Sequence, residues 1–463
     1  MKLIEKDVVI IGAGLTGLSI AYYLKKAGKN VLIVECNDRV GGVINSVTEN
    51  GFTYEQGPST GVLATAEIMD LFAELNKQCS LVTANKQKAG KRYIWKNKKW
   101  EALPTGLLSA IKTPLFSLYD KFRILGEPIR PKGGHPDESI AALVVRRLGQ
   151  SYLDYAVDPF ISGVYAGDPH QLITRHALPK LYALENEHGG FIRGTIAKHK
   201  GAKITSHKNA HKVTREVFSV VWGLKNLTDT LATEIGSGNI ILNNKELNIK
   251  NSSKGFDVSC SNNVVIHSSV VISTVGAYVL PSLFPFVSKE LMENIENTTY
   301  APVIHVTVGY NKWSGVKLDG FGGLVSSKEK RKVLGVLFPS AIFANRAPDG
   351  GALLSVFMGG INHPDFMKFS DAEIETIVKE ELGLTMQVDN EPDLIRIHRY
   401  KHAIAQYDIK SEKRLECISA VEKQFPGLIL AGSMRDGIGM ADRVKQAKTM
   451  VDQLINNSDM FVN

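Results

Sequence analysis

The chain has 463 residues, of which 44% are hydrophobic and 22% charged; this length suits about three globular units and excludes a largely disordered chain. Lys and Arg outnumber Asp and Glu by 55 to 47, and an excess this small over this length identifies no particular anionic partner. The four cysteines lie far apart and include no CxxC pair, so we expect no metal site, no disulfide framework and a reducing compartment.

The N-terminal segment predicts a βαβ unit with a nucleotide-binding turn. Residues 8–11 form an apolar run typical of a buried parallel strand, residues 16–27 have helical periodicity ending at Gly28, and residues 31–34 predict a second strand. The turn between strand and helix matches GxGxxG in Gly12, Ala13, Gly14, Leu15, Thr16 and Gly17. Such a turn brings the free N–H groups of a helix start to a pyrophosphate.

Glu35 closes the second predicted strand, 18 residues after Gly17. A carboxylate there accepts hydrogen bonds from ribose hydroxyls and disfavours a 2′-phosphate, which argues against NADP. These residues predict a bound dinucleotide and leave NAD and FAD as alternatives.

The rest of the chain alternates between helical and β patterns. Residues 91–103 predict a hairpin, 107–125 an amphipathic helix and 137–148 a further helix after a Pro- and Gly-rich loop at 128–136. Residues 213–241 predict a helix and strand, and 300–399 read mostly as β, with runs at 303–308, 333–338 and 353–357. The tail predicts a strand at 428–431 and a helix at 441–455.

One stretch, residues 269–287, carries no charge and approaches the length of a membrane span. It also contains Gly276, Pro281 and Pro285, which interrupt a helix in lipid. We therefore expect a buried strand at 270–274, a turn and a short helix.

The glycines after Glu35 resemble a wider group of flavoproteins. Arg39-Val40-Gly41-Gly42 is similar to the second glycine motif of the glutathione-reductase-like flavoproteins, a group that includes amine oxidases, phytoene desaturases and protoporphyrinogen oxidases, and residues 51–58 (GFTYEQGP) are similar to their next signature. Near the C-terminus, Leu430-Ala431-Gly432 and Gly437-Ile438-Gly439-Met440 resemble the strand end and helix start that face the flavin. The resemblance implies FAD, with contacts from Arg39, Gly41, Gly42, Gly57, Pro58, Ser59, Thr60, Leu247, Gly432, Ile438, Gly439 and Met440 in addition to the first glycine turn and Glu35.

The middle of the chain narrows the resemblance to one family. Residues 158–169 (DPFISGVYAGDP) resemble a segment of protoporphyrinogen oxidases that amine oxidases lack, and further matches follow in family order at 181–190, 320–325, 334–338, 345–348 and 357–360. The family implies flavin-driven oxidation of a porphyrinogen, with no catalytic side chain and no metal. Its substrate pocket falls on Arg92 for a propionate, on Gly167 facing the reacting bridge carbon, and on Leu324, Leu337 and Phe357 sandwiching the rings.

The sequence departs from the family pattern at several positions, and it leaves alternatives to the implied function. The run Val221-Trp222-Gly223-Leu224 stands where the family has a doubled glycine before a helix, Ala405 where it has a proline and Val43 where it often has an arginine. The same chemistry on coproporphyrinogen III is the nearest alternative to protoporphyrinogen IX, and a flavin amine oxidase or a redox-silent flavin scaffold are more distant ones.

The implied architecture is an α/β protein: a Rossmann-like FAD-binding domain of the glutathione-reductase type, a β-sheet substrate domain and a helical membrane-contact insert. We expect FAD-binding segments at 1–75, 206–275 and 412–463, substrate-domain segments at 76–92 and 276–411, and the insert at 93–205. The expected partners are a porphyrinogen and dioxygen or another electron acceptor, and no nucleic acid; a homodimer stays open.

The expected location is the cytoplasm, since no signal peptide precedes the first strand. The block at 103–125, with Lys112, Lys121 and Arg123, is a candidate for contact with the surface of the cytoplasmic membrane. The alternative is an ordinary amphipathic helix that faces the core.

Overall fold

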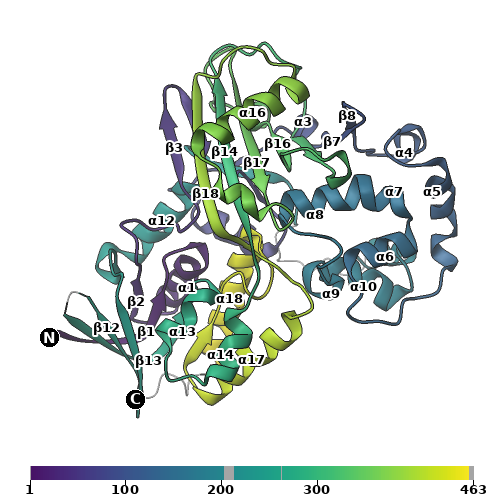
Figure 1. Cartoon of the computed structure of the whole chain (residues 1–463). Coiled ribbons are helices and arrows are strands. Elements are labelled where there is room, and N and C mark those ends of the chain that lie inside the picture. Colours follow the sequence, from purple (N-terminus) through teal and green to yellow (C-terminus); the bar gives the residue numbers. More distant parts are fainter. Residues whose placement is uncertain (1, 203–212, 262, 458–463) are drawn as a thin grey trace.

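Strands from both ends of the chain meet in one sheet (Figure 1). The computed structural model describes residues 2–202, 213–261 and 263–457. In it, β1 (Lys2–Ile11) pairs in parallel with β2 (Val31–Val34) and with β13 (Val264–Ser273). The remaining strands of this sheet are β10 (Ile240–Ile241) beside β2, β19 (Leu428–Leu430) in parallel with β13, and β12 (Gly255–Cys260) and β11 (Leu247–Ser252) antiparallel on the same side. The division into domains stays a prediction, and its boundary at 205/206 lies outside the described residues.

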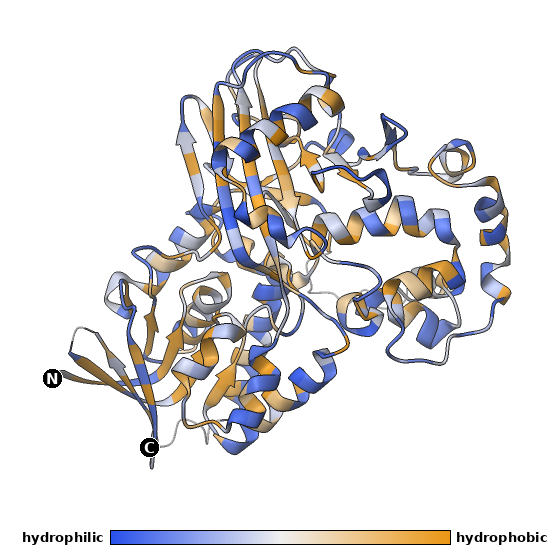
Figure 2. Cartoon of the chain, viewed as in Figure 1, coloured by the Kyte–Doolittle hydropathy of each residue, from blue (hydrophilic) through white to orange (hydrophobic). Residues whose placement is uncertain are grey.

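Helices cover both faces of this first sheet, which explains why residues 8–11 of β1 and all of β2 are apolar and buried (Figure 2). One face packs against α1 (Leu15–Lys26), α2 (Ala66–Glu74), α12 (Lys225–Ile235) and α18 (Met440–Asn456). The other packs against α13 (Leu280–Leu283), α14 (Lys289–Glu296) and α17 (Ser411–Gln424). The predicted βαβ unit and C-terminal strand and helix are thus confirmed.

A second sheet forms the upper lobe in Figure 1. Its strands, in spatial order, are β18 (Leu394–Ala405), β14 (Tyr300–Tyr310), β17 (Ala352–Gly359), β16 (Gly335–Leu337), β15 (Gly322–Val325), β7 (Arg92–Lys96) and β8 (Lys99–Ala102). The hairpin predicted at 91–103 is confirmed as β7 and β8, whereas the strand expected at 333–338 spans only β16.

The prediction that residues 300–399 are mostly β is wrong at α16 (Asp371–Met386), which packs on one face of the second sheet. The Ser370 side chain caps this helix by accepting the Glu373 N–H, and the Glu373 carboxylate accepts the Ser370 N–H in turn. Ile374, Val378 and Leu382 recur at helical spacing and are buried. The helix signal was therefore present locally.

Two small sheets complete the β structure. β3 (Ser46–Glu49) and β4 (Phe52–Glu55) form a hairpin, and β9 (Val217–Val220) joins β5 (Gly61–Val62) to β6 (Leu81–Thr83). Residues 213–241 therefore contain β9 in addition to the predicted helix α12 and strand β10. Two short helices, α3 (Lys86–Ala89) and α15 (Pro339–Ile342), flank these sheets.

The third lobe is helical. It contains α4 (Leu107–Lys112), α5 (Leu118–Arg123), the 3₁₀ helix η1 (Ile124–Ile129), α6 (Ile140–Arg147), α7 (Gln150–Tyr152), the π-helical turn Leu153–Val157, α8 (Asp158–Val164), α9 (Thr174–Ala177), α10 (Pro179–His188) and α11 (Phe191–Ala202). The single helix expected at 107–125 is wrong: the chain breaks between α4 and α5, where Pro114 cannot donate a helical hydrogen bond. The helix expected from 137 begins at Ile140, because the Ser139 side chain caps it.

The uncharged stretch at 269–287 forms the end of β13, a 3₁₀ turn at Ala277–Val279 and α13, as predicted. Among the described residues, no helix combines the length and the hydropathy needed to span a bilayer.

Candidate functional site

The first glycine turn is built so that backbone, not side chains, lines it. Gly12 has φ +101°, a conformation that L side chains rarely adopt, and a Cβ on Gly17 would overlap the Gly12 carbonyl oxygen. At Gly14, in contrast, a Cβ would meet nothing within 4 Å. This open space lies at the start of α1, where the first N–H groups of the helix lack intrahelical acceptors, so the turn fits a pyrophosphate.

The second glycine motif packs directly on the first. The Gly41 N–H donates to the Ala13 carbonyl (2.8 Å), and a Cβ on Gly42 would lie 3.2 Å from the Gly14 Cα. The Arg39 guanidinium donates to the carbonyls of Val40, Gly42 and Ile44. Arg39 therefore stabilises the second glycine turn, which packs against the first.

The Glu35 carboxylate lies at the edge of the same turn. It is buried, and its Oε2 accepts from the Ala13 N–H at 2.7 Å while its Oε1 accepts from the Asn37 N–H at 2.9 Å. The Glu35 backbone also pairs with the segment after α12: its N–H donates to the Ile241 carbonyl, and its carbonyl accepts the Asn244 N–H. Leu247, proposed from the resemblance, lies three residues further on and begins the outer strand β11.

Residues 56–60 connect the cradle to the second sheet. Gly57 passes so close to the Val43 carbonyl that a Cβ would overlap it, and Pro58 and Thr60 are half-buried beside Ser59. The Ser59 Oγ is buried and has no hydrogen-bond partner among the described residues. A buried hydroxyl without a partner fits a bound ligand with polar atoms at this place.

The C-terminal motif contributes a second helix start. The Gly432 N–H donates to Gln446 Oε1, and α18 begins at Met440 directly after the Gly437–Gly439 turn. Asp442 accepts the Gly439 N–H, while Ile438 packs against Tyr407 and the helical lobe. Since α18 packs along α1 in the same core, both helix starts belong to one side of the first sheet.

Four of the proposed pocket residues share one face of the second sheet. Leu324 and Phe357 both pair with Gly335, and Arg92 and Leu337 both pair with Gly322, two positions along the same strands. The opposite face of the sheet packs against α16. Leu324, Leu337 and Phe357 are half-buried, and Arg92 is exposed, with its guanidinium 5.5 Å from the centre of the Phe321 ring.

The Tyr165–Gly167 turn of the helical lobe reaches the same face. Ala166 packs in a cluster with Val303 and Phe357, and the Ala166 carbonyl accepts the Ile361 N–H. Gly163 of α8 lies against Leu324, where a Cβ would collide with the leucine methyls. The structure thus brings all five proposed pocket residues to the junction of the second sheet and the helical lobe.

His305 is a residue of this junction that the sequence reading missed. Its Nδ1 lies 2.8 Å from the Gln56 carbonyl, which identifies Nδ1 as the donor, and its ring stacks on Phe357. Burial lowers the pKa of His305 to about 4, so the ring is neutral at neutral pH. A histidine within the mostly apolar strand at 303–308 was the available signal.

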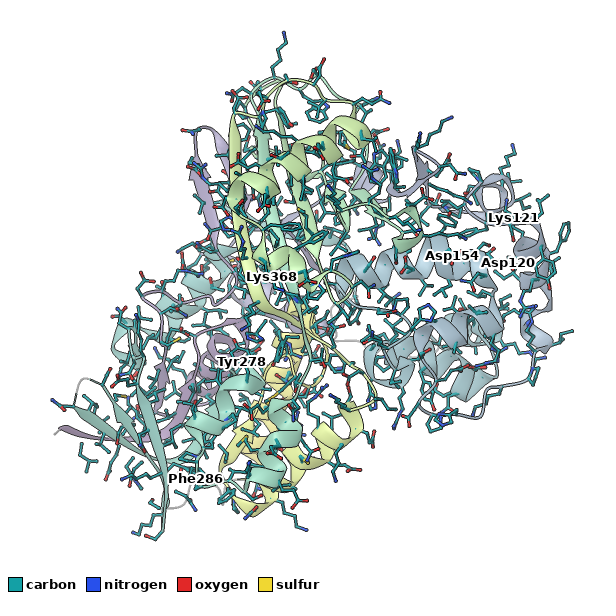
Figure 3. The ribbon with its side chains drawn as sticks, viewed as in Figure 1. Asp120, Lys121, Asp154, Tyr278, Phe286 and Lys368 are labelled. Atoms are coloured by element: carbon teal, nitrogen blue, oxygen red, sulfur yellow. The ribbon has the colours of Figure 1, made fainter. Side chains whose placement is uncertain are left out.

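Aromatic stacking joins the first sheet to the second. Tyr278, labelled in Figure 3 where the first and second sheets meet, stacks on His402 of β18 with ring centroids 4.0 Å apart. The Tyr300 ring lies nearly perpendicular to that of His402, and its hydroxyl accepts the Ala277 N–H. These contacts tie the nucleotide lobe to the sheet that carries the pocket.

Comparison with known proteins agrees with this geometry. Residues 15–455 match the family model described as flavin containing amine oxidoreductase. The chain is 30% identical to protoporphyrinogen oxidase 2, chloroplastic/mitochondrial, of Arabidopsis thaliana, over 97% of this chain and 94% of the relative, and 26% identical to coproporphyrinogen III oxidase of Bacillus subtilis, over 97% and 98%.

The fold has a close match among solved structures. A crystal structure from Exiguobacterium sp. 255-15 superposes with a TM-score of 0.81 at 23% identity, over 98% of this chain and 99% of the other. The whole length of the chain, and not the nucleotide lobe alone, thus follows one flavoprotein fold. The chain is a flavoenzyme with FAD as its cofactor, and it belongs to the flavin-containing amine oxidoreductase family, within the group of protoporphyrinogen oxidases.

Proposed function

We propose that this chain oxidises protoporphyrinogen IX to protoporphyrin IX, and that the exposed face of the second sheet holds the substrate. The observation that carries this proposal is the arrangement of Leu324, Leu337 and Phe357 as half-buried apolar side chains on one sheet face, with Arg92 at its open end. A flat apolar macrocycle with carboxylate side groups suits such a face, since the rings pack on apolar side chains and an arginine pairs with a carboxylate.

The chain's residues hold and orient both reactants. The glycine turns at 12–17 and 41–42, Glu35 and the 57–60 segment would bind FAD, and bound FAD supplies a two-electron acceptor. Six electrons and six protons leave the porphyrinogen in three two-electron rounds, and dioxygen is the proposed final acceptor. In each round the chain contributes mainly position, holding a bridge carbon in an apolar, water-poor slot.

Coproporphyrinogen III is the second candidate substrate, because one relative at 26% identity carries that name. The two substrates differ in the number of propionates. Arg92 is exposed beside the apolar side chains of the proposed pocket, whereas Arg396, farther along the same sheet face, is paired with Glu49. One arginine at this place favours the substrate with fewer carboxylates.

Anaerobic mixing of the FAD-loaded protein with each porphyrinogen tests the proposal. We expect rapid bleaching of the flavin by protoporphyrinogen IX and slower bleaching by coproporphyrinogen III; a flavin that stays yellow with both would reject a porphyrinogen oxidase. Arg92→Ala should raise KM for protoporphyrinogen IX roughly 10-fold, the loss of about 1.4 kcal/mol that corresponds to one hydrogen bond to a charged group. Arg92→Lys keeps the positive charge but cannot donate two parallel hydrogen bonds, so its KM should lie between those of the unmodified protein and Arg92→Ala.

We further propose that the outer rim of the helical lobe contacts an anionic membrane surface. Seven side chains there, which we call the apolar rim, are 60–81% exposed: Leu108, Ile111, Leu118, Tyr119, Phe122, Leu125 and Ile129. Figure 3 places Lys121 on this rim, away from both sheets, and Lys112 and Arg123 add positive charge. Clustered exposed apolar residues beside basic ones are typical of peripheral membrane contact.

The base of the apolar rim is rigid, which supports a docking role. The Lys121 ammonium donates to the carbonyls of Ile111 and Thr113, which ties α5 to α4, and the Arg123 guanidinium donates to the carbonyls of Val145 and Arg146 in α6. The apolar side chains are therefore held outward by contacts beneath them.

Flotation with acidic and with neutral liposomes tests this contact. The unmodified protein should float with acidic vesicles at low salt, and Leu118→Glu with Phe122→Glu should abolish flotation while leaving flavin content unchanged. Leu3→Glu, at a residue that is 66% exposed on β1, is the matched control. Equal flotation of the double variant and the control would reject the proposal.

A further inference from the structure

Gln406 and Tyr407 are adjacent, follow β18 directly and are both almost fully buried, at 3% exposure each. Their side chains contact different lobes: Gln406 contacts the Tyr165–Gly167 turn, and Tyr407 contacts the turn before α18. In the proposed function, the first turn faces the substrate and the second belongs to the FAD site.

The amide of Gln406 holds the backbone of the substrate-side turn. Its Nε2 donates to the Tyr165 carbonyl at 2.9 Å and to the Ile404 carbonyl at 3.0 Å, linking residues 241 positions apart. Its Oε1 lies against Gly167, where a Cβ would collide with it. The turn can therefore approach Gln406 this closely only because residue 167 is glycine.

The turn that Gln406 holds is conformationally strained. Ala166 has φ +47°, in the left-handed region that non-glycine residues rarely adopt. Such a conformation persists only where surrounding contacts over-determine it. Besides Gln406, the Ile361 N–H donates to the Ala166 carbonyl at 2.8 Å, and Gly360 leaves room for that carbonyl.

Tyr407 makes the corresponding contacts on the cofactor side. Its hydroxyl accepts the Gly437 N–H at 2.8 Å and lies 3.0 Å from the Ser433 carbonyl, to which it donates. The Tyr407 carbonyl accepts the Ile173 N–H from the helical lobe, and the Arg414 guanidinium lies 5.4 Å from the centre of its ring. Tyr407 thus joins the Gly437–Gly439 turn, β18 and the helical lobe.

We propose that Gln406 and Tyr407 are positioning residues that set the spacing between the substrate-side turn at 165–167 and the cofactor-side turn at 437–439. This inference rests on the proposed function. In the step whose geometry they set, the substrate loses a hydride with both bonding electrons from a bridge carbon and a proton from a pyrrole nitrogen, and bound FAD would supply the hydride acceptor. The two residues are consecutive at the end of β18, which is held in a seven-stranded sheet, so they fix both turns to one rigid element. If either turn moves, the distance between the substrate and the cofactor changes.

The experiment compares Gln406→Leu and Tyr407→Phe with the unmodified FAD-loaded protein. Leucine removes the donor while keeping a buried side chain, and phenylalanine removes only the hydroxyl. A misplacement of about 1 Å lowers the rate of a positioned reaction roughly 100-fold. We therefore expect flavin reduction by protoporphyrinogen IX to slow 10- to 100-fold in each variant, with KM changed less than threefold.

A readout independent of turnover is hydrogen exchange of backbone amides, measured with and without FAD. Gln406→Leu should speed exchange at Gly167 and Ile361, and Tyr407→Phe should speed exchange at Gly437. Tyr310→Phe, which removes a hydroxyl from a tyrosine that is 1% exposed at the distant end of β14, is the control and should change neither reading. If Gln406→Leu does not fold, Gln406→Met is the second variant, because methionine is unbranched, of similar length and has no hydrogen-bond donor.

Unchanged reduction rates in both variants overturn the inference, and so does a slowing matched by a proportional rise in KM. If the unmodified protein is not reduced by any porphyrinogen, the proposed function fails first, and the hydrogen-exchange result then decides whether Gln406 and Tyr407 still couple the two turns. Absence of faster exchange at Gly167 and Gly437 overturns that coupling.

Discussion

The imidazole of His305 lies face to face with the phenyl ring of Phe357, with ring centroids 4.6 Å apart and planes inclined by 9°. The same imidazole donates to the Gln56 carbonyl, one residue before Gly57 of the proposed FAD segment. A single buried side chain therefore contacts both the cofactor-side backbone and a residue of the proposed substrate pocket.

Shortening Phe357 should weaken substrate binding more than it weakens the fold. Phe357 is half-buried, so Phe357→Ala removes part of an aromatic surface offered to the substrate, and a loss of about 1.4–2.8 kcal/mol of apolar contact raises KM roughly 10- to 100-fold. Steady-state kinetics with protoporphyrinogen IX measure it. Phe357→Leu should recover part of the loss; a KM for Phe357→Ala equal to that of the unmodified protein would remove Phe357 from the pocket.

His305 should make stability depend on pH in a defined window. The pKa of His305 is held at about 4 by burial, whereas an unfolded histidine titrates near 6.5, so the unfolded state binds more protons between these values. Stability is therefore unaffected above pH 6.5 and falls as the pH drops from 6.5 towards 4, by up to about 3 kcal/mol from this group.

Urea unfolding at several pH values, for the unmodified protein and for His305→Gln, measures that dependence. Because other groups also titrate, the informative quantity is the difference between the two curves. Glutamine cannot take up a proton, so the unfolding free energy of the variant should fall less steeply below pH 6.5. Parallel curves would show that His305 is not responsible.

Gly14→Ala and Gly17→Ala should separate cofactor binding from folding. A Cβ on Gly14 meets no atom within 4 Å, so the apoprotein should keep its melting temperature, but the methyl group occupies the space proposed for the pyrophosphate and should weaken FAD binding at least 10-fold. A Cβ on Gly17 overlaps the Gly12 carbonyl, so that variant should lose stability as well.

Titration with FAD and thermal unfolding of the apoproteins distinguish the two variants. Gly238→Ala, at another glycine with open space and no positive φ, is the matched control and should bind FAD normally. Normal FAD affinity in Gly14→Ala would place the cofactor elsewhere.

Arg147 should be essential to the helical lobe and dispensable for FAD binding. It is fully buried, donates to Glu185 at 2.7 Å and pairs with the equally buried Glu127, whose carboxylate accepts the first N–H groups of α11. Burial by itself would raise the pKa of Glu185, but hydrogen bonds from Arg146, Gly133 and Arg147 lower it to about 2. Removing Arg147 takes the ion pair from the buried Glu127 and leaves Glu185 with Arg146.

We expect Arg147→Met to destabilise the helical lobe by about 3–5 kcal/mol. Limited proteolysis should then cut within residues 107–202, while FAD binding persists in the remaining protein. Arg193→Met, at an exposed position of α11, is the control. Resistance to proteolysis equal to that of the control would contradict the structural role of the buried cluster.

The sequence alone predicted the parts of the fold that depend on neighbouring residues. The strand at 8–11, the glycine turn, the helix ending before Gly28 and the strand at 31–34 are encoded by periodicity and by backbone conformations that only glycine adopts readily, such as φ +101° at Gly12. The capping box at the start of α16 is also a local signal, although the surrounding β patterns led to the prediction of strands there.

Tertiary structure decided everything that joins distant parts of the chain. The apolar residues of α4 and α5 have a helical pattern whether they face the core or the solvent, and only packing shows that they point outward. Likewise, the sequence shows Gln406 only as a polar residue that follows a strand, and its contact with Tyr165, 241 positions away, appears only in the folded chain. The local sequence pattern determines the conformation of a segment, but the contacts between distant side chains depend on how the whole chain packs into its hydrophobic cores.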